Sequence, residues 1–570
     1  MGLFDYKNAG SEAGKALYSD AIALTLYAYT PTGQPLPATA WAPIGAAALG
    51  YQGNVGAQGT FYGEKDGFTS AEAEVLGKYD GAGKLIGIGI AFRGTGGLGY
   101  SDTFGDMKNN LLAAVGPVDY ATNYAKNAFD TLLKDVAAFA IAHGLSAKDV
   151  LVSGHSLGGL GVNSLAELSG NNWGGFFKDA NYIAFASPTQ SATGNNVLNI
   201  GYENDPVFRV LDGTTFSSGS LGKHDGHQAS ATNNIVNFND QYASTAQNLV
   251  PFSILNPLNW SAHGSLGYAD GLNRVIDSRF YDLTDKDSTL IVSNLSESSR
   301  GSIWVEDLGR SGEPHTGSTF IIGTDSNDWL KGGAGNDFIE GRDGNDRFRD
   351  DGGYNLLLGG KGSNTFELQK PLQNFSFAND GDGTLYVRDA YGGISLTRDI
   401  GALVSKESGS WWGSKEVTYN VTANGLLNGT ELTHYNHSLN GDGYGDGNGN
   451  TLVASVDGDW LFGNAGDDLL RSDKNHVTFV GGAGNDVMQA SGGGNNTFLF
   501  SGAFGFDAIN GYQGSDKLVF MGVQGAGQGY DYAQHATQAG NDTVLKIGDY
   551  AVTLVGVGLD NLSASGITFA

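Results

Sequence analysis

Residues 323–349 read GTDSNDWLK, GGAGNDFIE and GRDGNDRFR, which are three successive copies of one nine-residue pattern. The register continues at Asp350 and Gly359, and a second block repeats it from Gly445 until one inserted residue shifts the last copy, residues 491–499. The pattern matches the G-G-x-G-x-D-x-U-x nonapeptide of parallel β-rolls, in which U is a large aliphatic residue. A flexible glycine-rich linker would not keep Asp and apolar residues in register. We therefore predict two β-roll blocks, residues 321–370 and 445–500.

Each copy combines a tight glycine turn with a short strand whose apolar residue points inward. The turn offers backbone carbonyls and an Asp at the sixth position, and calcium prefers such hard oxygen ligands. Ca²⁺ is therefore the predicted cofactor. The best ligands should be the sixth-position aspartates: Asp328, Asp337, Asp346, Asp459, Asp468 and Asp486. Asparagine should weaken the site at positions 355, 364, 450 and 496, and Val477 should remove the side-chain ligand from its copy.

Composition agrees with a multidomain calcium-binding protein. A chain of 570 residues predicts two or three domains, and 90 glycines against 16% charged residues is far from ordinary globular usage. The formal charge of −28 argues against nucleic acid or anionic membrane surfaces as partners. The chain has no cysteine, which excludes disulfides and a thiol nucleophile. No apolar run reaches the roughly 18 residues of a membrane span, and residues 1–7 lack the features of a cleavable signal peptide.

Residues 1–320 show a different sequence pattern, because apolar strands alternate with helical periodicity as in an α/β domain. Residues 85–92 are a predicted buried strand, residues 118–143 a helix that ends at Gly144, and residues 149–153 a strand followed by a helix. Residues 371–444 and 501–570 contain alternating stretches that predict antiparallel strands which cap or extend the rolls. We describe residues 371–444 as a β-sandwich segment.

A nucleophile motif stands at the predicted strand-to-helix junction of the first domain. Residues 154–158 read Gly-His-Ser-Leu-Gly, the G-x-S-x-G pattern of a nucleophile elbow. The bare pattern arises easily by chance in such a glycine-rich chain, but here an apolar strand precedes it and a helix follows. The sharp turn would expose the Ser156 hydroxyl, so Ser156 is the predicted nucleophile.

A serine nucleophile needs a histidine base that a carboxylate orients, and in this fold the order along the chain is Ser, acid, His. The loop after residues 197–200 offers Glu203 or Asp205, and we prefer Asp205 because the loop turns directly after it. His263 is the preferred base because a helix-like stretch follows it. His224 and His227 lie on a polar loop, and His315 lies at the domain junction.

Two donors are needed for an oxyanion hole. One is the backbone N–H of Leu157, directly after the nucleophile. The other should follow the strand at residues 85–92, where Thr95 offers both a backbone N–H and a hydroxyl.

These motifs together resemble the type I-secreted RTX lipases of Gram-negative bacteria and the similar polyester-polyurethane esterases. The resemblance covers residues 92–95, 154–160 and 201–206, the loop that ends at His263, both repeat blocks and residues 552–557. It implies Ser156, Asp205 and His263 as the triad. It also implies calcium in the catalytic domain, at Asp102 and Asp106 with Glu72, and at Asp287 with the loop of residues 225–234.

One difference from the true lipases concerns access to the site. The region around residues 31–51 is shorter than in lipases that carry an extra lid there, which favours an open, esterase-like site. Residues 96–115 place apolar side chains at helical spacing, so they form either a core helix or a mobile lid over Ser156.

The sequence as a whole predicts an α/β-hydrolase catalytic domain at residues 1–320, followed by rolls and β segments to residue 570. We expect a secreted serine carboxylic-ester hydrolase that acts on triacylglycerols or polyesters through an acyl-enzyme. Export should use a type I secretion apparatus, with the signal in residues 552–570 of the segment 501–570. The alternative is a secreted calcium-binding adhesive or structural protein with an inactive hydrolase-like head.

Overall fold

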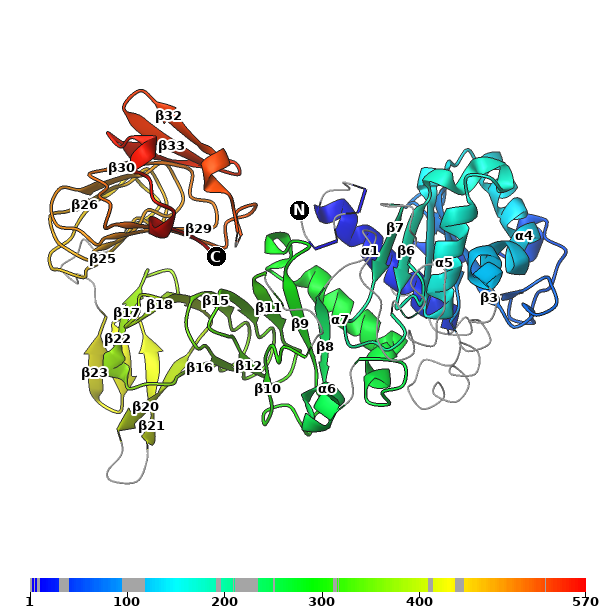
Figure 1. Cartoon of the computed structure of the whole chain (residues 1–570), viewed down its shortest axis with the longest axis horizontal. Coiled ribbons are helices and arrows are strands. Elements are labelled where there is room, and N and C mark those ends of the chain that lie inside the picture. Colours follow the sequence, from blue (N-terminus) through cyan, green and yellow to red (C-terminus); the bar gives the residue numbers. More distant parts are fainter. Residues whose placement is uncertain are drawn as a thin grey trace. The chain divides into compact units, whose positions relative to one another are not determined.

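The computed structural model divides the chain into two compact units, shown in Figure 1. Residues 1–281, 285–296 and 309–315 form the first, here called the hydrolase unit, and residues 282–284, 297–308 and 316–570 form the second, the roll unit. The structure describes residues 3–4, 6–7, 11–29, 40–94, 118–190, 196–208, 210, 234–249, 252–310, 315, 317–408, 414–435, 445–527 and 529–570.

A seven-stranded sheet forms the centre of the hydrolase unit, in the order β1-β3-β4-β5-β6-β7 with β2 paired to β3. Strands β4 to β7 are parallel, and β1 to β3 are antiparallel at one edge. The bounds are β1 Trp41–Pro43, β2 Phe61–Tyr62, β3 Glu72–Tyr79, β4 Leu85–Phe92, β5 Val150–His155, β6 Asn181–Phe185 and β7 Val197–Ile200. The predicted buried strand is confirmed, because β4 is almost entirely inaccessible to solvent.

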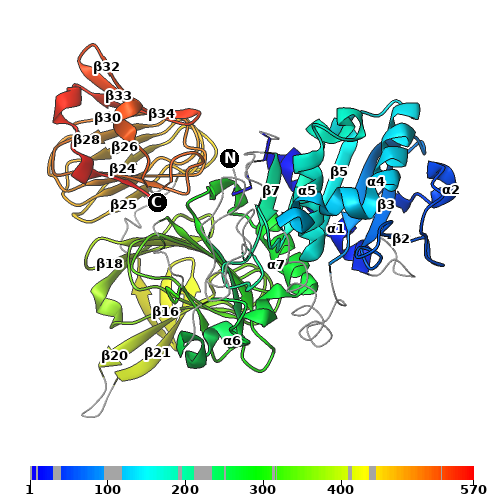
Figure 2. The same ribbon diagram turned by 45° about the vertical axis from the view of Figure 1, so that its right-hand side comes forward.

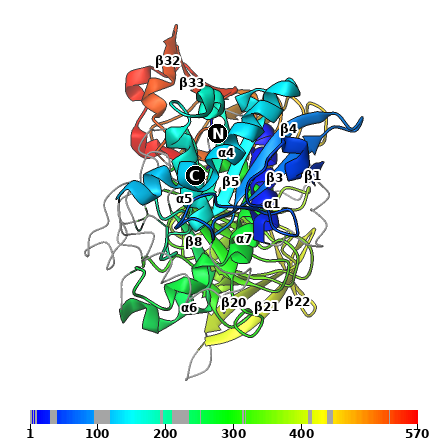
Figure 3. The same ribbon diagram turned by 90° about the vertical axis from the view of Figure 1, so that its right-hand side faces the viewer.

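Helices cover both faces of this sheet, as Figure 3 shows edge-on. Helices α4 (Val118–Ala142) and α5 (Leu157–Leu168) pack together on one face, while α1 (Ser11–Tyr29) and α7 (Ser265–Asp277) pack together on the other. Helix α4 is kinked at Phe129, and the Glu64 carboxylate accepts the N–H groups of Thr131 and Leu132 just beyond the kink. The shorter helices and 3₁₀ turns are α2 Ala46–Leu49, α6 Asp240–Ala243, Ala147–Asp149, Trp173–Asp179, Thr245–Leu249, Asn259–His263 and Tyr281–Leu283. Strands β8 (Ile235–Asn239) and β9 (Thr289–Asn294) form a parallel pair outside the seven-stranded sheet.

The first roll consists of two sheets between which successive nonapeptides alternate. One sheet contains the parallel strands β10 Trp304–Val305, β12 Trp329–Lys331, β14 Arg347–Arg349, β16 Thr365–Leu368 and β20 Ala402–Ser408; the other contains β11 Thr319–Ile322, β13 Asp337–Glu340, β15 Tyr354–Leu358 and β19 Ile394–Arg398. Leu330 pairs with Phe348, and Phe348 with Phe366, so one full coil takes two repeats. These side chains are buried, as the repeat pattern predicts.

Residues 371–444 extend both sheets of the first roll. Strands β17 (Phe375–Asn379) and β18 (Thr384–Asp389) join β19 in antiparallel pairing, and β21 (Ser414–Thr422), β22 (Gly425–Asn428) and β23 (Glu431–His434) join β20. Each described strand of this segment therefore extends one of the two sheets of the first roll. The prediction that such strands cap or extend the roll is confirmed.

The second roll continues well beyond residue 500 (Figure 2). One of its two parallel sheets contains β24 Thr451–Val453, β26 Leu469–Ser472, β28 Val487–Ala490, β30 Phe506–Asn510 and β34 Tyr550–Val555. The other contains β25 Trp460–Phe462, β27 Thr478–Val480, β29 Thr497–Ser501, β31 Lys517–Met521 and β35 Ile567–Phe569. Strands β32 (Ala536–Ala539) and β33 (Asp542–Ile547) pair antiparallel with each other, and β33 pairs with β34. The repeat pattern misses this extension because Met488 pairs with Ile509 and Phe498 with Leu518, and the inserted residues break the nine-residue period.

Short 3₁₀ turns complete the roll unit at Leu372–Asn374, Tyr532–Gln534, Leu559–Asn561 and Ala564–Gly566. Across the described part of the chain, the helices are too short or too polar to cross a bilayer.

Candidate active site

The nucleophile elbow forms where strand β5 ends and helix α5 begins. Ser156 lies between them with φ 60° and ψ −124°, a conformation that is costly for a residue with a side chain and that recurs at functional sites. A Cβ added to Gly154 would lie 2.6 Å from the backbone of Gly158, and one added to Gly158 would lie 2.1 Å from the carbonyl oxygen of Phe92. The two glycines of the motif are therefore required by close backbone packing around the serine.

Three predicted residues meet at this elbow. The Oγ atom of Ser156 lies 2.9 Å from Nε2 of His263, and Nδ1 of His263 lies 2.9 Å from both carboxylate oxygens of Asp205. His263 ends a 3₁₀ turn directly before α7, and Asp205 lies in the loop after β7. All three side chains are buried. The arrangement is that of a serine, its base and an orienting acid.

Further hydrogen bonds hold the acid in its ionised form. The backbone N–H of Val207 and the hydroxyl of Tyr268 donate to opposite oxygens of Asp205, at 2.8 and 2.5 Å. Burial alone would raise the pKa of Asp205, but the charge and hydrogen bond of His263, followed by the bonds from Tyr268 and Val207, lower it overall. Sequence reasoning missed Tyr268, because an aromatic residue inside a helix carries no motif that marks it as a partner of the acid.

The alternative acid and one alternative base pair with each other instead. The Nε2 atom of His315 lies 3.0 Å from the carboxylate of Glu203, and both side chains are nearly buried. Glu203 is therefore engaged away from the elbow, which favours Asp205. His224 and His227 lie outside the described residues.

Of the two expected oxyanion donors, Leu157 lies within the described residues and Thr95 does not. Leu157 is the first residue of α5, where a backbone N–H has no partner within the helix and points outward beyond the N-terminal end of the helix. Thr95 lies outside the described residues, but Gly94 precedes it, and a Cβ added to Gly94 would lie 3.0 Å from Cβ of Ser156. The chain after β4 thus passes directly beside Ser156.

Only part of the calcium site expected in the hydrolase unit lies within the described residues. Asp102 and Asp106 are outside them, as are residues 96–115 and positions 225–233. The Glu72 carboxylate forms an ion pair with Arg93. Asp287 is exposed, and its backbone N–H donates to Asp285. Within the described residues, no group of three or more acidic or histidine side chains is arranged to hold a metal ion. The ligands Glu72, Asp102, Asp106 and Asp287 stay predictions.

The repeat aspartates form ladders along both rolls. The N–H of Asp328 donates to Oδ1 of Asp346, and the N–H of Asp468 donates to Oδ1 of Asp486, each one full coil further along. The predicted ligands Asp328, Asp337, Asp346, Asp459, Asp468 and Asp486 are all buried. The second carboxylate oxygen of Asp346, Asp468 and Asp486 is buried without a hydrogen-bond partner among the described residues. Such an oxygen fits a cation, because a buried carboxylate without a partner is otherwise costly.

Asp507 belongs to the same ladder, although no repeat marks it. The N–H of Asp486 donates to its Oδ1 at 2.8 Å, and its Oδ2 is buried without a partner among the described residues. Burial raises the pKa of Asp346 and of Asp507 to about 8, and that of Asp486 to about 6. Each of these carboxylates would be stabilised in its charged form by a bound cation.

Comparison with known proteins agrees with this geometry. The RTX calcium-binding nonapeptide repeat matches four times, at residues 316–348, 340–368, 444–476 and 478–498. A lipase of Pseudomonas fluorescens is 53% identical over 57% of this chain and 79% of that protein, and a second lipase from the same species is 50% identical over 57% and 84%. The chain belongs to the RTX lipase family. The crystal structure of the extracellular lipase LipA from Serratia marcescens matches this RTX lipase with a TM-score of 0.93 and 50% identity over all of both chains. The likeness confirms the α/β-hydrolase and β-roll architecture, and the matched repeats confirm Ca²⁺ as the cofactor of this RTX lipase. Asp507 lies beyond the last matched repeat.

Proposed function

We propose that this RTX lipase is a secreted serine hydrolase that cleaves carboxylic esters through an acyl-enzyme on Ser156. The 2.9 Å contact between Ser156 Oγ and His263 Nε2 is the observation that carries the proposal. A free serine hydroxyl is a weak nucleophile at neutral pH, and a neutral imidazole at hydrogen-bond distance can accept its proton as the new bond forms. Family membership argues against the alternative of an adhesive protein with an inactive head.

The reaction follows from the positions of the three side chains. Oγ of Ser156 attacks the ester carbonyl carbon while its proton moves to Nε2 of His263. The N–H of Leu157, with Thr95 as the second expected donor, stabilises the oxyanion. His263 then returns the proton to the departing alcohol as the carbon–oxygen bond breaks. A water molecule repeats the sequence on the acyl-enzyme, giving the carboxylic acid and free Ser156.

Asp205 supports this proton transfer without exchanging a proton itself. Its carboxylate accepts a hydrogen bond from the Nδ1–H group of His263, which leaves Nε2 free to act as the base. The ionised form of Asp205 also stabilises the imidazolium that forms during each step. The hydroxyl of Tyr268 contributes to keeping that charge in place.

In the roll unit, bound calcium supplies the positive charge that lets the buried carboxylates of each ladder lie close together. The side chains that we expect to hold it, together with turn carbonyls, are Asp328, Asp337, Asp346, Asp459, Asp468, Asp486 and Asp507. Because free calcium is scarce inside cells, we propose that the chain is exported unfolded by a type I secretion apparatus and folds outside. Deleting residues 552–570 should leave the protein in the cells and remove it from the medium; unchanged secretion would contradict this placement of the signal.

An organophosphorus ester tests the central proposal. A fluorescent alkyl phosphonate should label the calcium-bound chain on Ser156 and abolish its esterase activity, whereas Ser156→Ala should stay unlabelled. Labelling that persists in Ser156→Ala, or an unlabelled active protein, would contradict the assignment.

The substrate class is a separate question. We propose triacylglycerols and polyesters, because the relatives are lipases and the site lies in an α/β-hydrolase domain. Rates on p-nitrophenyl esters of increasing chain length, on emulsified triacylglycerol and on a dispersed polyester would rank these substrates.

A further inference from the structure

A second histidine lies directly behind the nucleophile. His155 precedes Ser156 at the end of β5, is 3% exposed, and takes no part in the proton transfer proposed above. Its ring packs 4.8 Å from that of His263 and 5.2 Å from that of Tyr268, measured between ring centroids. It therefore contacts both the base and the residue that holds the acid.

The ring of His155 is oriented by Tyr29, the last residue of helix α1. The Tyr29 hydroxyl lies 3.0 Å from Nδ1 of His155, and both groups are buried. Burial raises the pKa of Tyr29, so its hydroxyl keeps its proton and can either donate to Nδ1 of His155 or accept from it. Burial, followed by the charge of His263, lowers the pKa of His155 to about 3, so the ring stays neutral beside His263.

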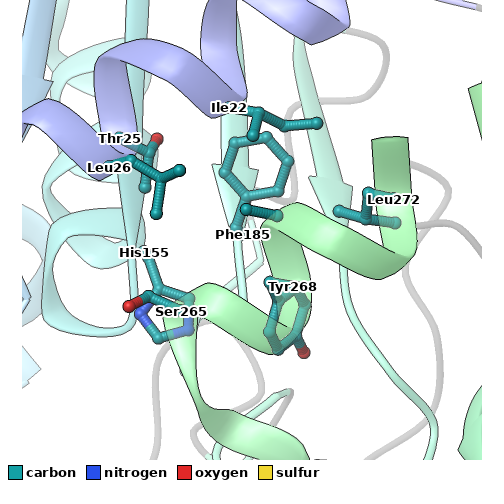
Figure 4. A pocket seen from close by; sticks show the side chains of 9 residues that line it. Ile22, Thr25, Leu26, His155, Phe185, Ser265, Tyr268 and Leu272 are labelled. Atoms are coloured by element: carbon teal, nitrogen blue, oxygen red, sulfur yellow. The ribbon is translucent and has the colours of Figure 1, made fainter. Parts of the chain in front are cut away.

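The His155 side chain also lines a small pocket that is mainly apolar (Figure 4). The pocket is lined by side chains of α1, α7 and β6, and its other polar residues are Thr25, Ser265 and Tyr268. Nε2 of His155 has no hydrogen-bond partner among the described residues. The hydrogen bond with Tyr29 orients this ring from one side, and a backbone hydrogen bond of His263 also acts on it.

The same hydroxyl reaches the chain that leaves strand β4. A Cβ added to Gly94 would lie 2.2 Å from the Tyr29 hydroxyl, 2.5 Å from the carbonyl oxygen of His155 and 3.0 Å from Cβ of Ser156. A backbone hydrogen bond of Gly94 also acts on Tyr29 and lowers the pKa of its hydroxyl, against the larger effect of burial. Tyr29 is therefore in contact with the two segments that lie beside Ser156, the end of β5 at His155 and the chain after β4 at Gly94.

We propose that Tyr29 and His155 are a pair of positioning residues that hold the nucleophile elbow against the chain at Gly94. This inference rests on the proposed function, because it assigns a role only if Ser156 is the nucleophile. Neither side chain is a donor or acceptor of the proton in the proposed reaction. Their effect is on the placement of Ser156 Oγ relative to His263 and the oxyanion donors, and small errors there slow catalysis strongly.

The test compares Tyr29→Phe with Tyr27→Phe in the full, calcium-bound chain. Tyr29→Phe keeps the ring and deletes the hydroxyl, and Tyr27 is a half-buried tyrosine on the same helix outside the site. With p-nitrophenyl butyrate, Tyr29→Phe should lower kcat about 10-fold and change KM less than about twofold. The reason is that misplacement of Ser156 Oγ weakens the transition state more than it weakens substrate binding. Tyr27→Phe should keep the activity of the unmodified chain. Normal kcat in Tyr29→Phe, or an equal loss in Tyr27→Phe, would overturn the proposal.

Two further measurements separate positioning from a loss of folding. Affinity for an alkylboronic acid, which forms a tetrahedral adduct on the serine, should fall in Tyr29→Phe by the same factor as kcat, at temperatures well below its melting transition. His155→Phe should cost a similar factor, and the double variant should be no slower than either single one, because the two residues act through one bond. Unchanged boronic-acid affinity, or losses that multiply to about 100-fold, would contradict a positioning pair.

Phosphonate labelling of the unmodified chain keeps the two proposals distinguishable. If Ser156 is labelled and Tyr29→Phe is fully active, the positioning role is wrong and the proposed function stands. If Ser156 is not labelled, the proposed function fails, and the positioning role fails with it.

Discussion

The hydroxyl of Tyr268 donates a hydrogen bond of 2.5 Å to the carboxylate of Asp205, on the oxygen opposite to the one that accepts from the backbone of Val207. Together with His263, these donors surround a carboxylate that has no access to water. A buried carboxylate is stable in its charged form only when such partners are present. The acid of the proposed triad is therefore supported by helix α7, the same helix that follows His263.

Replacement of Tyr268 tests this support. Tyr268→Phe should lower kcat about 10-fold and destabilise the hydrolase unit by about 1–3 kcal/mol, the cost of removing a hydrogen bond to a buried charge. Because the bond lowers the pKa of Asp205, its stabilisation is present above the ordinary pKa of about 3.9 and is lost as pH falls through the lower folded-state value. Thermal unfolding at several pH values would measure this. Tyr202→Phe is the matched control, since its hydroxyl bonds to the Gly267 carbonyl and not to Asp205; equal loss of kcat in both variants would exclude a specific role for Tyr268.

The triad itself should behave as one unit. Ser156→Ala, His263→Ala and Asp205→Asn should each reduce kcat by about 10³-fold or more, and Ser156→Ala/His263→Ala should be little worse than either single change. Single-turnover and steady-state assays on a soluble p-nitrophenyl ester would check this. Activity of His263→Ala within about 10-fold of the unmodified chain would reassign the base.

Calcium-dependent folding of the rolls should depend on pH. In the calcium-free fold, buried Asp346, Asp486 and Asp507 keep protons at pH values where the unfolded chain has lost them, so stability without calcium falls as pH rises from about 4 to 8. Calcium binds the deprotonated carboxylates, so its apparent affinity should rise over the same range. Circular dichroism of the full chain should show a calcium midpoint at about pH 5.5 that is at least about 10-fold higher than at pH 8. Equal calcium midpoints at the two pH values would show that these carboxylates do not lose protons when calcium binds.

Asp507 should bind calcium even though it lies outside the matched repeats. Asp507→Asn keeps an oxygen to accept the N–H of Asp486 but removes the charge, so the calcium concentration needed to fold the second roll should rise several-fold. Melting curves at limiting calcium would measure the change, and at saturating calcium the variant should approach the unmodified chain. Asp549→Asn, in an exposed turn between β33 and β34, is the control; the same shift in both variants would mean a general charge effect.

Local and periodic features were predictable from the sequence. The nine-residue period determined the strands, the inward apolar residues and the ladder of aspartates from Asp328 to Asp486, because each repeat contains its own turn, ligand and strand. The elbow around Ser156 was equally clear, since a strand, a sharp glycine-flanked turn and a helix follow one another directly in the chain. Where inserted residues broke the period, the same reasoning ended the second roll too early and missed Asp507.

The tertiary structure decided the contacts between distant residues. His263 lies 107 positions from Ser156 and 58 from Asp205, so the sequence left Glu203 and three other histidines open until the fold brought one acid and one base together. Tyr29, His155 and Tyr268 gain their roles in the same way, because their hydrogen bonds join α1, β5, α7 and the loop after β7. Where the period held, and at the elbow, neighbouring residues were enough to place turns, strands and the start of a helix. Which buried polar groups satisfy one another depends on how those segments pack, and only the folded chain fixes that.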